Sequence, residues 1–241
     1  FVRESIVVPL EMRSTTLAFP TADQSESGVA WPHGVVNGEL ITFKSEPDYA
    51  RGIAPAGSIW SSATDMARWI SANLPVDETE RPLLNPDTLH EMHSPQAIIP
   101  VGHKVTRYPL KNYASSGLGW FVEDYRGRKV VRNSGAMNGF IAWVTLLPSK
   151  RFGFVILANS HRTGINFALH HRILDDVIGV PAKDWSTIVL NDYTNGYYGQ
   201  LSQSRLDYEK KRRTDTKPDL PLPEYAGTFR HDLFGDLTVR G

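Results

Sequence analysis

Two apolar stretches separated by a short polar turn constrain the fold of this chain more than any other feature. Residues 140–147 and 152–158 are rich in β-branched and aromatic side chains, and the turn between them contains Ser149-Lys150-Arg151. Such a short connection joins antiparallel neighbours, because parallel strands need a crossover of a dozen or more residues. Residues 117–122 and 129–132 are further strand candidates, joined by an Arg-Gly-Arg turn. The sequence therefore predicts a sheet of consecutive antiparallel strands.

Helical patterns flank these strands. Residues 61–70 begin with a Ser or Thr cap, carry Asp65 in the first turn and place an apolar stripe on one face. Residues 165–178 repeat this apolar spacing and end at Gly179, a residue that commonly terminates helices. Residues 86–92 form a shorter helical pattern. The predicted fold class is α+β, with an antiparallel sheet flanked by helices.

The composition excludes several function classes. Lys and Arg total 26, as do Asp and Glu, so the zero net charge gives no reason to expect nucleic acid as a partner. The absence of Cys excludes disulfide scaffolds, thiolate zinc sites and cysteine nucleophiles. The adjacent His170 and His171 would point about 100° apart on a helix, so they make a poor metal site. We expect neither a metal nor a cofactor.

Five short segments carry a resemblance to a known family. They are residues 8–12 (VPLEM), 53–67 (IAPAGSIWSSATDMA), 116–120 (SGLGW), 132–140 (RNSGAMNGF) together with 154–159, and 220–238. Each segment alone is weakly specific, but all five occur in the order typical of one family. The chain resembles the serine β-lactamase and penicillin-binding-protein family, in particular its class C β-lactamase-related members. The resemblance covers nearly the whole chain.

The resemblance implies an organisation in three parts. Residues 1–185 would be the C-terminal part of a β-lactamase-like catalytic domain, and residues 186–221 a linker. Residues 222–241 would begin a small β-barrel-like module that is often appended to these enzymes. The chain opens in a helical pattern at Phe1 and stops in a strand pattern at Gly241. We therefore expect an incomplete domain, cut at both ends.

The family acylates a serine held in a Ser-x-x-Lys motif at the start of a helix, where the lysine can take the hydroxyl proton. No Ser in this chain is followed three residues later by Lys. The single Tyr-x-Asn match, at Tyr193, comes after the third family motif rather than before it, and we interpret it as chance. The nucleophile and the general base are thus expected upstream of Phe1, in the missing N-terminal half of the same domain. That half is one expected partner, and this chain alone is expected to be inactive.

The third family motif corresponds to residues 133–136. By resemblance, the backbone N–H of Ala136 would be an oxyanion donor, Gly135 would let substrate approach the strand, and Ser134 would hydrogen-bond substrate. Asn133 stands where the family usually has Lys or His, and it cannot carry a positive charge. Recognition of an anionic carboxylate should therefore be weaker. The alternative is that Asn-Ser-Gly is a simple turn between two strands.

Three further side chains are candidates for substrate binding. Trp60 and Trp31 lie in segments that read as loops, and Met137 directly follows the third motif. Packing in the core is the alternative role for the aromatic residues. The basic run at residues 210–213 is interpreted as a solvated face of the linker, not as a nucleic-acid site.

The expected function of the intact protein is serine hydrolysis of an ester, a D-amino-acid peptide or a β-lactam. A small-molecule or peptide substrate is thus the second expected partner. The alternative is a non-catalytic binding protein that keeps the fold and the cleft, and Asn133 is the residue that favours it. The sequence fixes neither the substrate nor the oligomeric state. It does not fix the compartment either, although a periplasmic or secreted location is slightly favoured.

Overall fold

The computed structural model describes residues 1–18, 28–36, 39–42, 54–75, 83–101, 111–137, 139–160, 163–181, 183–195 and 197–240. Ile53 and Asn138, which belong to the motifs above, lie outside these ranges. The chain divides into two compact units, Phe1–Thr194 and Asn195–Gly241, which are described separately. The domain boundaries expected at residues 185 and 221 stay predictions.

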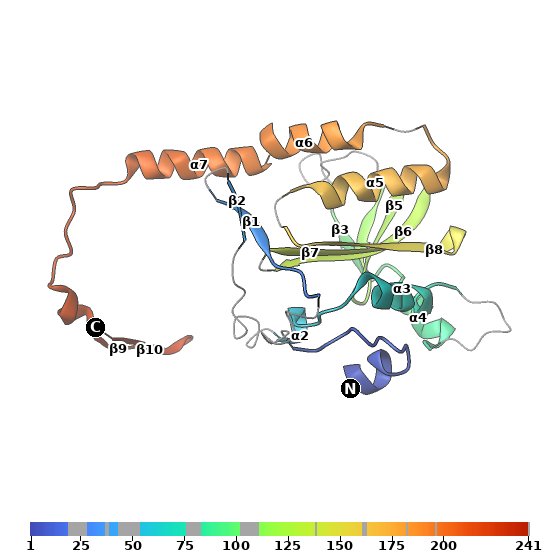
Figure 1. The fold of residues 1–241 in the computed structure, drawn as a ribbon, viewed down its shortest axis with the longest axis horizontal. Helices are drawn as coiled ribbons and strands as arrows, with labels where there is room; N and C mark the ends of the chain where they lie inside the picture. Colours follow the sequence, from blue (N-terminus) through green and yellow to red (C-terminus); the bar gives the residue numbers. More distant parts are fainter. Residues whose placement is uncertain are drawn as a thin grey trace. The chain divides into compact units, whose positions relative to one another are not determined.

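A six-stranded antiparallel sheet forms the centre of the first unit (Figure 1). Its strands lie side by side in chain order, which confirms the prediction of consecutive antiparallel pairing. The strands are β3 (Ala97–Ile99), β4 (Ala114–Ser116), β5 (Phe121–Tyr125), β6 (Arg128–Met137), β7 (Phe140–Leu147) and β8 (Phe152–Ala158).

Two strand boundaries differ from the expectation. Strand β5 begins at Phe121, because the preceding residues form a tight turn in which Gly117 N donates to Trp120 O at 2.6 Å. Strand β6 continues to Met137, well beyond the predicted end at residue 132. The turn interpretation of Asn-Ser-Gly is therefore wrong: these residues pair in register with the apolar strand β7, and that pairing overrides their preference for turns.

The hairpin between β5 and β6 is closed by Arg126 and Gly127, at φ values of 52° and 75°. Two consecutive residues with positive φ match the turn whose twist suits neighbouring antiparallel strands. Gly139, with φ of 85°, lies in the next hairpin, between β6 and β7. These turns fix the register of β6 against both of its neighbours.

One helix covers each face of the sheet: α3 (Ala63–Ala72) lies on one face and α5 (Ile165–Ile178) on the other (Figure 1). Because side chains alternate along a strand, β6 contributes to two separate cores. The core on the α3 face contains Ile70, Trp120, Val131, Val144 and Leu146. The core on the α5 face contains Tyr125, Val130, Leu147 and Leu174.

Local signals explain where these helices begin and end. The Ser62 side chain accepts a hydrogen bond from Asp65 N at 3.2 Å and so caps α3. Helix α5 has the predicted bounds and ends at Gly179, whose φ of 78° puts it in the left-handed region. The other elements of this unit are η1 (Arg3–Val7), β1 (His33–Val36), β2 (Glu39–Thr42), α2 (Ala54–Gly57), α4 (Pro86–Met92), η3 (Pro148–Lys150) and α6 (Trp185–Asn195), the last reaching the first residue of the second unit.

The second unit consists mainly of helix α7 (Tyr197–Lys211) and a two-stranded hairpin. The hairpin pairs β9 (Gly227–His231) with β10 (Gly235–Val239) and follows the short turn η4 (Leu222–Tyr225). The described part of the chain has no helix that is long and apolar enough to cross a membrane.

Candidate active site

The predicted site residues lie on the second half of strand β6. Pairing with β5 ends at the Phe121–Arg132 pair, whereas pairing with β7 continues from Val131 to Met137. We call residues 128–132 the inner half of β6 and residues 133–137 the open half. In an antiparallel sheet the backbone N–H and C=O groups of a strand point alternately to its two neighbours. The open half therefore has one edge that no strand of the described residues covers.

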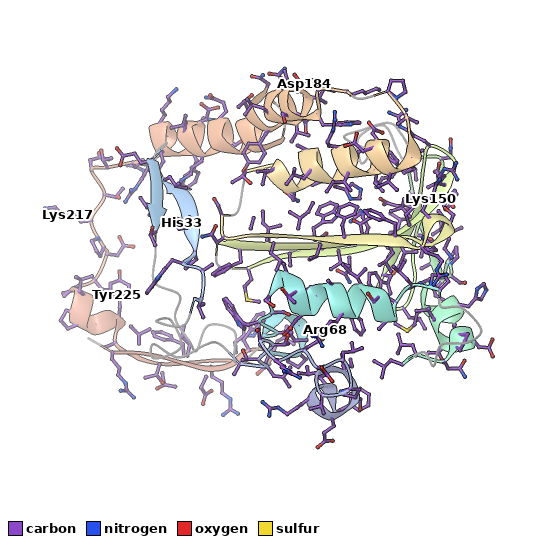
Figure 2. All side chains as sticks on the ribbon, turned by 45° about the vertical axis from the view of Figure 1, so that its right-hand side comes forward. His33, Arg68, Lys150, Asp184, Lys217 and Tyr225 are labelled. Carbon is purple, nitrogen blue, oxygen red and sulfur yellow. The ribbon has the colours of Figure 1, made fainter. Side chains whose placement is uncertain are left out.

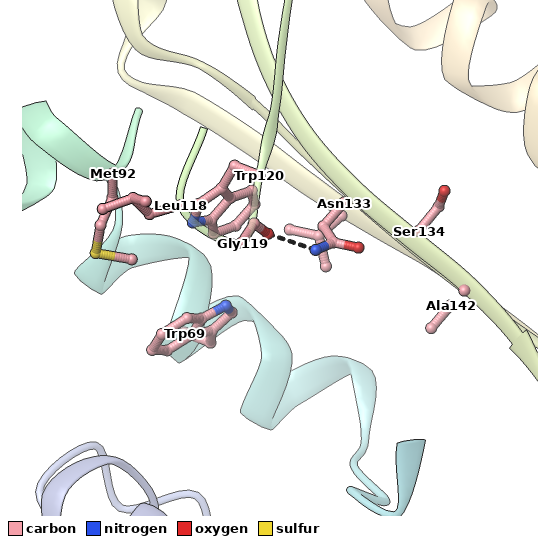
Figure 3. A pocket seen from close by; sticks show the side chains of 10 residues that line it. Trp69, Met92, Leu118, Gly119, Trp120, Asn133, Ser134 and Ala142 are labelled. Carbon is pink, nitrogen blue, oxygen red and sulfur yellow. Dashed lines mark hydrogen bonds between the residues drawn. The ribbon is translucent and has the colours of Figure 1, made fainter. Parts of the chain in front are cut away.

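Side chains of the open half alternate between the two faces of the sheet. Ser134 pairs with Trp143, and its hydroxyl points away from α3, whereas the methyl group of Ala142 points toward α3 (Figure 3). Gly135 is the partner of Ala142 and so lies on the α3 face, together with Asn133. The motif thus presents an amide and a glycine on one face and a hydroxyl on the other.

A cavity of about 340 Å³ opens on the α3 face beside the open half (Figure 3). Most of its wall is apolar, and every described residue in the wall is uncharged. The lining consists of Trp69, Met92, Leu118, Gly119, Trp120, Asn133, Ser134, Gly135, Ala142 and Val144. An apolar group can be buried there without leaving a charge in the wall unpaired.

The Asn133 side chain is fixed by one hydrogen bond. Its Nδ2 donates to the carbonyl oxygen of Gly119 at 2.5 Å, although the residue is exposed (Figure 3). Gly119 belongs to the turn before β5 and has φ of 78°, a conformation that favours glycine. This bond links the open half to the turn that forms one side of the cavity. It also orients the amide, because the reverse orientation would place two oxygens together.

Met137 and Trp60 lie at the end of the open half. Met137 pairs with Phe140, and the Trp60 ring meets the Phe140 ring edge-on with centroids 5.0 Å apart. The Met137 methyl group fills the space in which a Cβ on Gly57 would stand, so α2 packs directly on this residue. The structure thus gathers two of the three predicted substrate-binding residues near Ala136. Their contact with substrate stays a prediction.

Trp31 lies elsewhere. Its carbonyl oxygen accepts a hydrogen bond from Asn159 Nδ2 at 2.9 Å, just beyond the end of β8. The neighbouring His33 on β1 is labelled in Figure 2. Its backbone N–H donates to the carbonyl oxygen of Asn159 at 2.8 Å. Strands β7 and β8 therefore separate Trp31 from the open half of β6. The structure does not bring Trp31 to the other predicted site residues.

A charge cluster lies behind the inner half, on the α5 face. Glu123 is only 3% exposed and accepts hydrogen bonds from Arg132 Nε at 2.9 Å and from Lys111 Nζ at 2.5 Å. Burial alone would raise the pKa of the Glu123 carboxyl, but Arg132 and Lys111 outweigh it, so the pKa lies below its usual value. The Arg132 guanidinium also lies 5.0 Å from the ring centroids of Phe121 and Trp143. These contacts turn Arg132 away from the cavity.

This cluster was not among the predicted site residues. Glu123 lies beside Asp124 and just beyond the strand expected at residues 117–122, so the residue pattern gave no signal of its burial. Its partner Arg132 ends the strand expected at residues 129–132 and begins the family segment 132–140, and neither pattern indicates an ion pair. Glu123 and Arg132 come together because Phe121, which pairs with Arg132, brings the neighbouring Glu123 side chain onto the same face of the sheet. Such pairing follows from the register and not from spacing along the chain.

The buried imidazole of His170 lies against β7, the strand that pairs with the open half. His170 Nδ1, on α5, lies 3.1 Å from Trp143 Nε1 and 3.0 Å from Thr145 Oγ1. Because an indole nitrogen only donates, His170 Nδ1 is the acceptor and carries no proton. Burial, and then the neighbouring His171, hold the pKa of His170 well below its usual value. In the described part of the chain no group of three or more His, Asp or Glu residues is placed to hold a metal ion.

Comparison with known proteins adds a family match. A protein-family model described as Beta-lactamase matches residues 1–177. Unguisins hydrolase ungD of Aspergillus violaceofuscus is 28% identical over 223 residues, covering 83% of this chain and 37% of that protein. Unguisins hydrolase ungD' of Aspergillus campestris is 26% identical over 255 residues, covering 98% of this chain and 44% of that protein. The chain thus spans less than half the length of these relatives.

Solved structures with a similar arrangement include a class C beta-lactamase. It is 16% identical, with a TM-score of 0.45 over 80% of this chain and 50% of that chain. A Beta-lactamase/D-alanine Carboxypeptidase from Yersinia pestis is 24% identical, with a TM-score of 0.43 over 66% of this chain and 42% of that chain.

Proposed function

This chain belongs to the beta-lactamase family, and we propose that it supplies one wall of the active site of a serine hydrolase. The reaction would pass through an acyl-serine on an ester, a D-amino-acid peptide or a β-lactam. The serine and its base would come from a further part of the protein, since this chain has no Ser-x-x-Lys. We expect that part to cover the apolar cavity beside the open half.

The observation that carries the proposal is the uncovered edge of the open half. An acyl group lying along this edge would meet backbone N–H and C=O groups held in fixed positions by the pairing with β7. The N–H of Ala136 is the proposed donor to the oxygen of the tetrahedral intermediate. A preorganised donor of this kind raises kcat by a factor of roughly 10²–10³, because it is already aligned where negative charge develops.

Gly135 supports the same interpretation. Its φ is not positive, and a Cβ placed on it would meet no atom of the described chain within 4 Å. Neither backbone conformation nor packing among the described residues therefore requires glycine at this position. A substrate lying close to the backbone on the open edge would account for glycine there, because a Cβ would obstruct its approach.

In the proposed reaction the serine oxygen forms a bond to the carbonyl carbon of the substrate and gives its proton to the base. The tetrahedral intermediate then collapses, and the leaving group departs with a proton. Water attacks the acyl-serine in the same way and releases the acid. Residues 133–136 would hold the acyl group and stabilise both intermediates, and they would transfer no proton.

A non-catalytic binding protein is the less favoured alternative. It rests on Asn133 alone, at a position where the family usually has a cation. The two Aspergillus relatives, at 28% and 26% identity, both bear the name hydrolase. Since their alignments include most of this chain, these names favour catalysis.

Intact mass spectrometry tests the proposal. The longer protein would be incubated with penicillin or a fluorophosphonate, and its mass compared with that of an untreated sample and of a heat-denatured control. We expect one adduct on a serine outside residues 1–241 and no adduct on residues 1–241 alone. Labelling of a serine within this chain, or no labelling of the folded longer protein, would contradict the proposal.

A further inference from the structure

The open half of β6 and the described residues that line the cavity beside it carry no charge. The side chains of residues 133–137 are an amide, a hydroxyl, a hydrogen, a methyl group and a thioether. The lining of the cavity beside them is also uncharged. Any ligand group that leaves water to lie against this part of the described chain therefore meets only neutral partners.

The nearest cations along β6 are directed elsewhere. Arg132 binds Glu123 on the α5 face, and its side chain is only 16% exposed. Lys111 forms a salt bridge with the same carboxylate. Lys129 is on the α3 face but lies four residues before Asn133, roughly 13 Å along an extended strand. Among the described residues of β5 and β6, then, no cation is placed to contact a ligand on the open half.

The Asn133 side chain itself favours a ligand that donates a hydrogen bond. Its Nδ2 is held by the carbonyl oxygen of Gly119, which leaves Oδ1 as the more available polar atom of the side chain. A carbonyl oxygen accepts a hydrogen bond from an amide N–H and repels a carboxylate. The side chain is therefore oriented to receive a donor.

From these observations we propose that the open half of β6 selects substrates that are neutral where they contact Asn133. The substrate class is an internal or blocked peptide, or a neutral ester, and not an acyl compound with a free carboxylate at that point. The inference rests on the proposed function, whose substrate class it narrows. Its physical basis is the cost of removing a carboxylate from water without a cation to pair with it, whereas an amide can be fully hydrogen-bonded by a strand edge.

A matched pair of substrates tests this preference. N-acetyl-D-alanyl-D-alanine and its C-terminal amide differ only in the charge of one end. The longer protein would be assayed with both, and kcat/KM compared for the wild type, Asn133→Lys and Ser186→Lys. Ser186 is exposed on α6, so its substitution adds the same charge away from the strand. Calorimetric binding of both peptides would be measured on the same samples.

We expect the wild type to prefer the amide by at least about tenfold, as a site does when one partner would be left unpaired. Asn133→Lys should reverse the preference, and Ser186→Lys should leave the ratio within about twofold. A wild type that prefers the free acid, or a ratio that Asn133→Lys does not change, would overturn the inference.

A different set of results is expected if the protein is not a serine hydrolase. If neither peptide is hydrolysed and no serine is labelled, catalysis is excluded while calorimetry still decides the preference. Tighter binding of the acid, or no binding of either peptide, would then overturn the inference as well.

Discussion

On strand β6, residues 128–132 pair with β5, whereas residues 133–137 pair with β7 alone. The inner half contains Val130 and Val131, both fully buried, and the open half contains exposed Asn133, Gly135 and Ala136. One continuous strand thus serves two purposes. Its inner half is held by the core on both faces, and this fixes the backbone of the open half without covering its edge. A rigid edge that stays accessible is what a preorganised site requires.

The largest loss of stability is expected at the charge cluster behind the inner half of β6. Glu123→Ala would leave Arg132 and Lys111 without their buried partner, so the free energy of unfolding should fall by about 3–5 kcal/mol. Urea denaturation of the chain measures this loss. The control is Asp176→Ala, which removes a salt bridge to Arg172 whose side chains are 49% and 55% exposed, and it should cost less than about 1 kcal/mol. Equal losses would mean that burial does not distinguish the two sites.

A smaller loss of stability is expected from substitutions that compare the inner and open halves of β6 directly. Val131→Ala removes methyl groups from a residue that is 0% exposed and should cost about 2 kcal/mol. Asn133→Ala, two positions further on the same face, should change stability by only about 0.5 kcal/mol. Both variants would be compared by their denaturation midpoints. A loss at Asn133 as large as that at Val131 would show that the open half is a structural part of the core.

A third effect, the smallest per pH unit, concerns acid. The folded pKa of His170 lies below the unfolded value of about 6.5, so only the unfolded chain takes up this proton as the pH falls below 6.5. Stability should therefore be intact above pH 6.5 and decrease below it, by up to about 1.4 kcal/mol per pH unit for this one group. The groups facing His170 are Trp143, Thr145, His171, Arg132 and Lys111.

His170→Gln should flatten this part of the stability profile, since glutamine does not titrate. Denaturation midpoints between pH 7 and pH 5 give the slope. His231→Gln is the control, because His231 is exposed and lies in the second unit. If the two variants have the same slope as the wild type, His170 does not limit acid stability. His93, whose pKa burial and Lys129 lower to about 4, would contribute a similar slope that neither variant removes.

Periodicity and composition were sufficient to predict much of the fold. Helix α5 has the predicted bounds because its apolar spacing ends at a glycine, and β7 and β8 were visible as long apolar runs. The length of β6 was not predictable in this way. Asn133, Ser134 and Gly135 prefer turns, and only the pairing with β7 forces them into a strand.

The candidate site was identified through motif order, and the structure adds its physical form. The open edge results from β5 beginning at Phe121, a boundary set by the hydrogen bond within the preceding turn. The hydrogen bond from Asn133 to Gly119 joins residues 14 positions apart, and the ion pair of Glu123 with Arg132 joins residues nine positions apart across a hairpin. Contacts of this kind depend on register and hairpin geometry, which local residue patterns do not encode.

Hydrogen exchange along β6 of the longer protein, before and after labelling of its serine by a neutral fluorophosphonate, tests the central claim most directly. If the open half is the substrate edge, the amides of Ser134 and Ala136, which alternate with amides paired to β7, should exchange faster in the free protein than the amides of residues 128–132. Labelling should slow exchange of these two amides and leave the inner half unchanged. No labelling, or protection that is spread evenly over both halves, would contradict the assignment of residues 133–137 as the site strand.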